Sequence, residues 1–290
     1  MTVPVYPGMA PLARDYDAVI LDLWGVVHDG TRLYPGALDC LERLQGAGKR
    51  VVVVSNAPRR ALAVVETLRG LGIPERLFER VITSGDATRL ALARRTHPWY
   101  AALGRAYLHL GPERDARLLE GLDYRMVGAV EEAEFMLATG VVDREDELER
   151  YEPLLAAGVG RGLAMVCANP DRAVVRSGRR ELCAGALAER YAELGGEVSY
   201  EGKPYPLIYE LCFEALEGVK RRRVLAVGDG LKTDIAGAVG VGIDSVLVTG
   251  GLLADAWGVA RSSPPDAELL AAACAAAGAE PSAAILAFVW

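Results

Sequence analysis

Acidic, hydroxyl and basic side chains stand beside apolar runs of this sequence in a pattern suited to phosphoryl chemistry. Asp22 ends the run VILD, and Asp229 ends the run VLAVGD. Ser55 and Asn56 end the run VVVVSN, and Lys203 stands in the segment EGKPYP. If these groups meet, two carboxylates, a hydroxyl and an ammonium can hold a magnesium ion against a phosphate group. Their types therefore predict an enzyme of phosphoryl chemistry.

Each candidate residue alone also has an ordinary structural explanation. Asp229 followed by glycine can form a turn, and Asp234 and Ser55 can each cap a helix. Lys203 can be a surface residue, and Asp22 can be a buried, hydrogen-bonded carboxylate. The joint order and spacing of these residues favours one shared site over separate structural roles.

Short apolar runs rich in valine, isoleucine and leucine predict strands that are buried on both faces of a sheet. They cover Asp17–Trp24, Val51–Ser55, Val224–Asp229 and Ser245–Thr249. Helical patterns flank them over Ala37–Gln45, Ala61–Leu71, Pro206–Leu216 and Asp234–Val239. Strands that alternate with helices imply a parallel, doubly wound sheet, whose ligands bind outside the carboxyl ends of the strands. The polar residues above would then meet at one edge.

A second unit is predicted in the middle of the chain. Its strand-like segments are Ala106–Leu110, Phe135–Ala138 and Ala164–Ala168, and its helical patterns are Arg114–Glu120, Glu145–Ala157 and Leu182–Leu194. Near the C-terminus lie a helical pattern, Ala267–Ala279, and a strand-like piece, Ala284–Trp290. We therefore expect an α/β protein with a doubly wound, parallel, Rossmann-like core formed by residues 1–100 and 199–290, and an α/β cap domain inserted over residues 101–198.

Composition argues against several functional classes. The net charge of −7, with no basic run longer than Arg221–Arg223, argues against binding to nucleic acid or to anionic membranes. Five scattered cysteines show no zinc-site spacing and favour a reducing compartment. No signal-peptide pattern starts the sequence, and no apolar run approaches the roughly 20 residues that span a bilayer. We expect a cytoplasmic protein.

The motifs, taken in order, resemble those of the haloacid dehalogenase-like (HAD) hydrolase superfamily. They are LDLWGVVHDG with Asp22, then Ser55, then GKP with Lys203, and finally GDGLKTDIAGA with Asp229 and Asp234. The segments TSGDAT, CANPD and CAGALAE are similar to the branch that contains p-nitrophenyl phosphatases, pyridoxal phosphatases and ribonucleotide monophosphatases. The resemblance implies an α/β cap between the second and third motifs, a small phosphorylated metabolite as substrate and a Mg²⁺ cofactor. It also allows a homodimer formed through the cap.

The resemblance further implies a role for each matched residue. Asp22 would be the nucleophile that accepts the phosphoryl group as an aspartyl phosphate. Ser55 and the backbone N–H of Asn56 would hold phosphoryl oxygens, and Lys203 would neutralise both the phosphate and the nucleophile. Magnesium would bridge Asp22, the phosphate and Asp229.

Other residues would complete the implied site. Asp234 would support the metal through water or hydrogen bonds, and the backbone carbonyl of Trp24 would be a metal ligand. In the cap, Asn169 and Asp171 of CANPD and the arginines of the loop Arg176–Arg180 are candidates for substrate contacts. The same cap residues can equally form a strand-ending turn and a solvated loop.

One residue departs from the superfamily pattern. Most of its phosphatases have a second aspartate, the general acid and base, two residues after the nucleophile, where this chain has Trp24. Indole does not usefully exchange a proton near neutral pH, so a factor of about a hundred to ten thousand in rate must be lost or supplied otherwise. Three hypotheses stay open: a phosphatase with restricted substrates or another proton donor, a binding or regulatory protein, and a phosphotransferase. Asp29 and His28 are candidate donors, although both also suit the turn of a flap beside the site.

Overall fold

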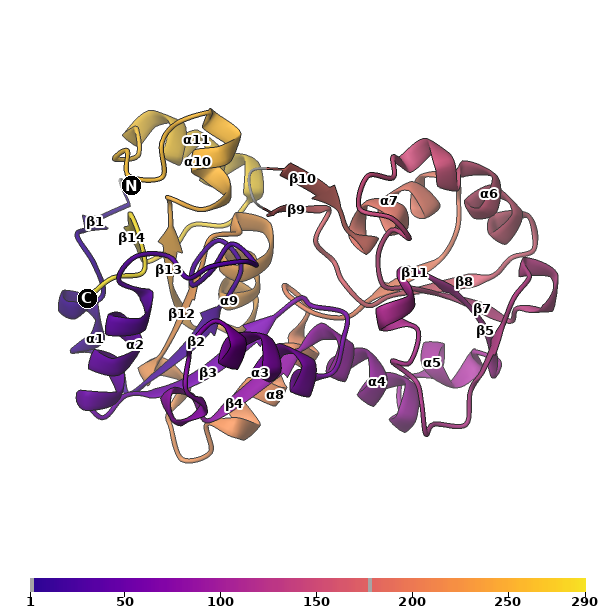
Figure 1. Ribbon diagram of the computed structural model, residues 1–290, viewed down its shortest axis with the longest axis horizontal. Helices are drawn as coiled ribbons and strands as arrows, with labels where there is room; N and C mark the ends of the chain where they lie inside the picture. Colours follow the sequence, from indigo (N-terminus) through magenta and orange to yellow (C-terminus); the bar gives the residue numbers. More distant parts are fainter. Residues whose placement is uncertain (1–2, 177–178) are drawn as a thin grey trace.

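Two parallel sheets, each with its own helices, and a two-stranded hairpin make up the described part of the molecule. The structure is a computed structural model that describes residues 3–176 and 179–290. Figure 1 shows a larger lobe, which holds both ends of the chain, and a smaller lobe beside it, which is formed by the middle of the chain. The chain therefore leaves the larger lobe once and returns to it.

The larger lobe is built on a sheet of seven parallel strands in the order β1-β14-β13-β12-β2-β3-β4. The strands are β1 (Val5–Tyr6), β2 (Ala18–Asp22), β3 (Arg50–Ser55), β4 (Arg80–Thr83), β12 (Val224–Gly228), β13 (Asp244–Val248) and β14 (Ala283–Ile285). Strand β2 lies between β12 and β3, so the carboxyl ends of these three strands adjoin.

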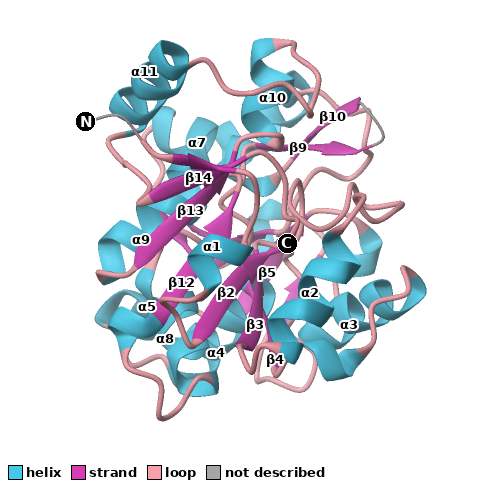
Figure 2. Cartoon of the chain, turned by 90° about the vertical axis from the view of Figure 1, so that its left-hand side faces the viewer, coloured by secondary structure: helices cyan, strands magenta, loops and turns pink. Residues whose placement is uncertain are grey.

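Helices cover both faces of this sheet (Figure 2). They are α1 (Ala10–Ala13), α2 (Ala37–Gly46), α3 (Ala61–Gly70), α4 (Ser84–Arg94), α8 (Pro206–Ala215), α9 (Ala236–Val241), α10 (Leu252–Trp257) and α11 (Ala267–Ala277). Val19 and Leu21 of β2 share a core with α2 and α3, whereas Ala18 and Ile20 share one with α8 and α9. Since successive side chains of a strand point to opposite faces, both faces of β2 must be apolar. The predicted doubly wound, parallel sheet is confirmed.

The smaller lobe contains a parallel sheet of five strands in the order β11-β8-β7-β5-β6. The strands are β5 (Ala106–Leu110), β6 (Arg125–Val127), β7 (Phe135–Ala138), β8 (Ala164–Cys167) and β11 (Val198–Tyr200), and the helices are α5 (Pro98–Ala102), α6 (Glu152–Gly160) and α7 (Ala184–Glu193). Among residues 3–176 and 179–290, no helix has the length and apolar character needed to cross a bilayer.

A β-hairpin stands where a loop was expected over Arg176–Arg180. Strand β9 (Ala173–Arg176) pairs in antiparallel register with β10 (Arg179–Leu182), and the hairpin extends from the smaller lobe toward α10 of the larger one (Figures 1 and 2). Residues 177 and 178 of that loop lie outside the described residues. The loop prediction was wrong because the sequence AVVR-SG-RREL combines β-branched residues with a two-residue turn signal, which is typical of a hairpin. Helix α7 consequently begins at Ala184.

Several short elements also differ from expectation. They are η1 (Glu75–Leu77), η2 (Glu113–Asp115), η3 (Val130–Glu132), η4 (Leu148–Tyr151), η5 (Arg221–Arg223) and the π-helical turn η6 (Leu231–Ile235). Only η2 forms where a longer helix over Arg114–Glu120 was predicted, and Leu118 and Leu119 pack their side chains into the core from the turns that follow. Strand β4 was not predicted because its apolar run is too short to stand out.

Candidate active site

The order of the strands brings the predicted polar residues to one edge of the larger sheet. Asp22 is the last residue of β2, Ser55 is the last residue of β3, and Asp229 directly follows β12. Because these strands are parallel and adjacent, their carboxyl ends meet. All three side chains are buried, which means that their polar atoms must be satisfied inside the site.

Lys203 lies at the centre of this group. Its Nζ donates hydrogen bonds to Oδ1 of Asp22 and, at 2.7 Å, to Oδ1 of Asp234. The backbone of Lys203 is held by the side chain of Asn56, whose Oδ1 accepts from the Lys203 N–H at 2.7 Å and whose Nδ2 donates to the Lys203 carbonyl at 3.1 Å. Residues from four separate segments are therefore joined through Lys203.

The carboxylates of Asp22, Asp229 and Asp234 form a compact cluster. One oxygen from each lies within 4.8 Å of the others, and all three residues are buried. The close approach depends on glycines: a Cβ on Gly25 would lie 1.8 Å from Oδ2 of Asp229, and one on Gly251 would lie 2.1 Å from it. Oxygen ligands at this spacing are the donor set that hard divalent cations such as Mg²⁺ prefer.

The electrostatics of the cluster favour a cation. Burial raises the pKa of Asp22 to about 7, although the ammonium of Lys203 opposes the shift. Burial, together with repulsion from Asp22 and Asp234, raises the pKa of Asp229 well above its usual range. Burial opposes the charge of Lys203, but Asp22 and Asp234 outweigh it and raise the pKa of the ammonium. Since one ammonium does not balance three carboxylates, the residues present fit a divalent ion.

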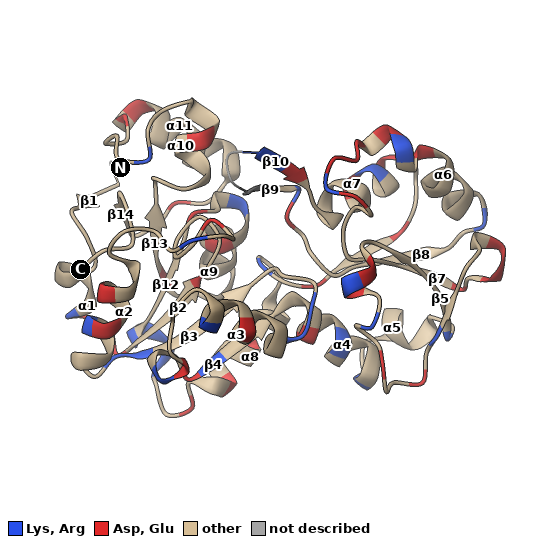
Figure 3. Cartoon of the chain, in the orientation of Figure 1, with Lys and Arg blue, Asp and Glu red and all other residues tan. Residues whose placement is uncertain are grey.

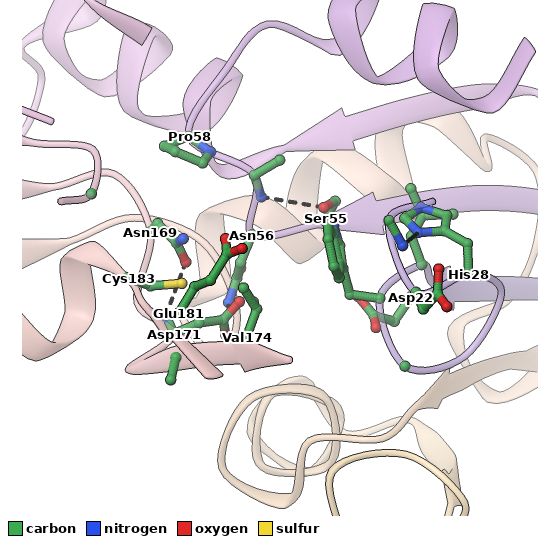
Figure 4. A pocket seen from close by; sticks show the side chains of 18 of the residues that line it. Asp22, His28, Ser55, Asn56, Pro58, Asn169, Asp171, Val174, Glu181 and Cys183 are labelled. Atoms are coloured by element: carbon green, nitrogen blue, oxygen red, sulfur yellow. Dashed lines mark hydrogen bonds between the residues drawn. The ribbon is translucent and has the colours of Figure 1, made fainter. Parts of the chain in front are cut away.

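Hydrogen bonds position Asp234 and the loop at the end of β3. Oδ2 of Asp234 accepts a hydrogen bond from the backbone N–H of Gly230 at 3.1 Å, which orients Oδ1 toward Lys203. Oγ of Ser55 accepts from the backbone N–H of Ala57 at 3.2 Å (Figure 4). The loop after β3 thus curls around its own serine, as a turn that cradles an anion would.

Trp24 packs into the flap that follows β2. Its ring meets the imidazole of His28 edge to face, with ring centroids 5.3 Å apart and planes inclined at 71°. Nδ1 of His28 accepts from the backbone N–H of Gly30 at 3.0 Å, and Gly30 itself lies against the indole. Trp24 is partly buried and lines the same cavity as Asp22.

Asp29 has the features of a turn residue. Its Oδ1 accepts hydrogen bonds from the backbone N–H groups of Thr31 and Arg32, each at 2.9 Å. Although partial burial alone would raise its pKa, these hydrogen bonds and those of the Thr31 hydroxyl and Arg32 guanidinium hold the pKa below its usual range. A carboxylate stabilised in this way does not suit the delivery of a proton near neutral pH.

The CANPD loop of the smaller lobe is tied to the loop after β3. Oδ1 of Asn169 accepts from the backbone N–H of Asp171 at 3.0 Å, which shapes the loop. Oδ1 of Asp171 in turn accepts from Nδ2 of Asn56 at 2.9 Å. Figure 4 shows these side chains together on one side of the cavity and Asp22 with His28 on the other. Asn56 therefore links the CANPD loop, Lys203 and the phosphate-binding loop expected from the sequence.

A cavity of about 500 Å³ joins the two lobes and contains the whole cluster. Its wall also includes charged residues that the sequence patterns did not single out: Arg59, Arg114, Asp115, Arg144 and Glu181. Arg59 follows the VVVVSNAP motif directly, which could have identified it. The other four come from the smaller lobe, where spacing along the chain carries no signal for a shared site.

A comparison with solved structures identifies the fold family. A haloacid dehalogenase-like family hydrolase from Brucella suis 1330 is 36% identical to this chain, covers 98% of it and 100% of that structure's chain, and has a TM-score of 0.84. The chain belongs to the haloacid dehalogenase-like hydrolase family. Residues 19–125 match the family profile described as haloacid dehalogenase-like hydrolase, and residues 200–277 match the profile described as HAD-hydrolase-like. The resemblance seen in the motifs is thus confirmed.

Other members of the HAD family carry names that describe phosphatases. The D-glycerol 3-phosphate phosphatase of Mycobacterium tuberculosis is 29% identical over 88% of this chain and 69% of its own length. A glycerol phosphate phosphatase from the same organism, solved in complex with magnesium, covers 83% of this chain and 70% of that structure's chain at 24% identity, with a TM-score of 0.63. The second comparison supports the shared fold.

Proposed function

We propose that this HAD-family hydrolase is a Mg²⁺-dependent phosphatase that removes the phosphoryl group from a small phosphorylated metabolite. The observation that carries the proposal is the cluster of Asp22, Asp229 and Asp234 in one cavity, with Nζ of Lys203 bound to Asp22 and Asp234. The names of the relatives point to the same class of reaction. The substrate would lie between the two lobes, where the cavity has room for a small molecule.

The chain's own residues divide the reaction into two displacements. An oxygen of Asp22 attacks phosphorus, the bond from phosphorus to the ester oxygen breaks, and the leaving alkoxide takes up a proton. Water then attacks the aspartyl phosphate, which releases inorganic phosphate and restores the Asp22 carboxylate. Lys203 holds the nucleophile in place and offsets charge on the phosphoryl oxygens, which Ser55 and the N–H of Asn56 hold by hydrogen bonds.

The acidic cluster would hold the metal. Asp22, Asp229 and the backbone carbonyl of Trp24 would be the direct ligands, with Asp234 supporting them. When bound, Mg²⁺ would supply positive charge that polarises the phosphoryl group and keeps the buried carboxylates ionised. The magnesium-bound structure of the glycerol phosphate phosphatase supports this choice of ion.

Trp24, which stands in place of the usual proton donor, restricts the leaving groups that the site can accept. Asp29 is occupied by turn hydrogen bonds, and His28 packs on Trp24 with Nδ1 taken by Gly30. The structure therefore favours a substrate whose leaving oxygen needs little protonation, or one that carries its own proton source, over a proton donor in the flap. Neither turnover-free binding nor phosphotransfer has a specific observation in its favour.

Release of inorganic phosphate from a panel of aryl phosphates and phosphorylated metabolites tests the proposal. We expect release with Mg²⁺ for at least one compound, loss of release with EDTA, and loss in Asp22→Asn. Absence of release across the panel, or equal release by Asp22→Asn, would contradict it. The buried, unpaired state of all five cysteines supports a reducing, cytoplasmic location, and dimerisation through the cap stays a prediction.

A further inference from the structure

Three arginines line the active-site cavity between the two lobes. Arg59 comes from the loop after β3, Arg114 from η2, and Arg144 from the segment after β7. Their side chains are 31%, 48% and 55% exposed, so each is partly accessible to solvent. Arg59 belongs to the larger lobe and the other two to the smaller lobe, so the group spans the space in which a substrate would lie.

The acidic partners of these arginines are too far away to satisfy them. Nε of Arg59 lies 3.6 Å from Oδ1 of Asp115, and Nε of Arg114 lies 3.7 Å from Oδ2 of the same residue. Nε of Arg144 lies 3.9 Å from Oε2 of Glu181. Hydrogen-bonded arginine–carboxylate pairs have distances of about 2.7–2.9 Å, so these three contacts are ion pairs without good hydrogen bonds.

Two atoms in this group are buried and unsatisfied. Nε of Arg59 and Oδ1 of Asp115 have no hydrogen-bond partner among the described residues, although Asp115 is only 3% exposed. Buried polar atoms are nearly always satisfied in folded proteins, and leaving one unsatisfied is costly. An oxyanion of a ligand could accept from Nε of Arg59, whereas Oδ1 of Asp115 could be satisfied only by a donor, such as a hydroxyl group of the same ligand.

The balance of charge indicates the sign of the group that would bind here. The ion pairs of these three guanidinium groups involve only two carboxylates, Asp115 and Glu181, although Arg32, Arg261 and Asp255 also line the cavity. Burial is the main cause that lowers the pKa of Arg114; the charges of Arg59 and Arg144 add to this shift, and Asp115 and Glu181 oppose it. A further anion would offset the repulsion between these cations and would accept the unused N–H donors.

We propose that Arg59, Arg114 and Arg144 form a second anion subsite, which binds a carboxylate or a second phosphate on the leaving group of the substrate. The subsite rests on the proposed function, because it gives a role in substrate binding to further residues of the same cavity. Guanidinium groups suit planar or tetrahedral oxyanions, since each offers paired N–H donors in a fixed geometry. The preferred substrates are then phosphomonoesters that carry another negative charge.

Three phosphomonoesters with the same carbon skeleton test this preference. Glycerol 3-phosphate has no second anion, 3-phosphoglycerate has a carboxylate, and glycerol 1,3-bisphosphate has a second phosphate. For at least one of the two compounds that carry a second anionic group, we expect kcat/KM to be about tenfold or more higher than for glycerol 3-phosphate. The compound preferred identifies the anion. Equal or lower values for both would overturn the subsite.

Variants of two subsite arginines assign the preference to these residues. In Arg114→Gln and Arg144→Gln the ratio of kcat/KM between the preferred compound and glycerol 3-phosphate should fall about tenfold. Arg117→Gln is the matched control, because Arg117 is an exposed arginine in the same region that does not line the cavity. A ratio that stays constant in both subsite variants, or falls equally in the control, would overturn the assignment. Thermal unfolding checks that all variants are folded.

Equilibrium binding separates the subsite from the proposed turnover. In the Asp22→Asn background, calorimetric titration with the same three compounds should show the same order of affinity, and Arg114→Gln should abolish the difference. Such binding together with an absence of phosphate release by the wild type would support the subsite and contradict the phosphatase. Phosphate release with equal affinity for all three compounds would support the phosphatase and overturn the subsite.

Discussion

Gly30 lies directly against the indole ring of Trp24, at a separation that leaves no room for a Cβ atom. A Cβ on Gly30 would stand 2.1 Å from the ring, and the backbone of Gly30 has φ = +87°, which L side chains rarely adopt. The flap and the tryptophan beside the nucleophile are therefore shaped to each other. This contact gives the tryptophan a packing role that an aspartate at the same position would lack.

Gly30→Ala should displace the flap. We expect a loss of about 1–3 kcal/mol in the free energy of unfolding, because strain at positive φ adds to overlap with the ring of Trp24. Urea unfolding measures the loss. Gly48→Ala is the control, since Gly48 has φ = +71° but no atom within 4 Å of its Cβ position, so it reports strain alone. Equal losses in the two variants would show that Trp24 does not restrict the flap.

Trp24→Asp should restore a proton donor beside Asp22. We expect phosphate release from simple alkyl phosphates to rise by about a hundredfold or more, because a carboxyl group can protonate the leaving oxygen. Trp24→Asn is the control, since it makes the same space and polarity without an exchangeable acid. Steady-state assays with an alkyl phosphate separate the two. If both variants gain equally, removal of bulk explains the change and proton transfer does not.

Mg²⁺ should stabilise the folded protein through the acidic cluster. At about 100 times its dissociation constant, an ion that binds only the folded state adds about 2.7 kcal/mol to the free energy of unfolding. Asp229→Asn should lose most of this gain. Without metal the variant should be more stable than the wild type near pH 7, because burial and repulsion make the ionised Asp229 costly. Thermal unfolding with Mg²⁺ and with EDTA measures both effects. Asp39→Asn, at an exposed ion pair, should respond to Mg²⁺ as the wild type does.

Glu201 should make stability depend on pH. This buried carboxyl accepts a hydrogen bond from the Tyr100 hydroxyl at 2.6 Å, and burial raises its pKa from 4.5 to about 7 even though that bond opposes the shift. The folded state therefore holds the proton more tightly than the unfolded state. The protonated Glu201 carboxyl therefore adds to the free energy of unfolding. This stabilisation is fully present below about pH 4.5 and is lost as pH rises through about 7, and the total loss is about 3 kcal/mol.

The variant Glu201→Gln should not show this loss. The difference in the free energy of unfolding between Glu201→Gln and the wild type should therefore grow in favour of the variant from pH 5 to pH 8. Chemical unfolding at several pH values measures it, with the exposed Glu214→Gln as the control. A difference that stays constant over this range would mean that Glu201 titrates alike in the folded and unfolded states.

Much of the larger lobe could be predicted from local patterns. The run Val51–Ser55 and the helical pattern Ala61–Leu71 match β3 and α3 within one residue at each end, because a strand buried on both faces must be apolar throughout. Patterns failed where the fold uses short or irregular pieces. Strand β4 has too few apolar residues to stand out, and the turns after η2 bury leucines without forming a helix.

The candidate site, too, could be predicted from the sequence only in part. Asp22 and Asp229 could be placed together from the sequence, since residues that follow parallel strands share an edge of the sheet. The interaction of Lys203 with Asp22 was expected only from the family resemblance, because its segment carries no strand or helix signal that fixes its position. The hydrogen bond of Lys203 to Asp234 was not predicted. The bond between Asn56 and Asp171 could not be predicted, since it joins residues from two lobes.

The sequence by itself determined which residues end the buried strands, and with them the acidic and hydroxyl groups available for phosphoryl chemistry. That information is local, because hydrophobic periodicity places a strand and the next residue emerges at its end. Tertiary structure alone decided that Arg59, Arg114 and Arg144 face one cavity and that Gly30 meets Trp24. Such contacts depend on how the lobes and the flap pack, and spacing along the chain does not encode them.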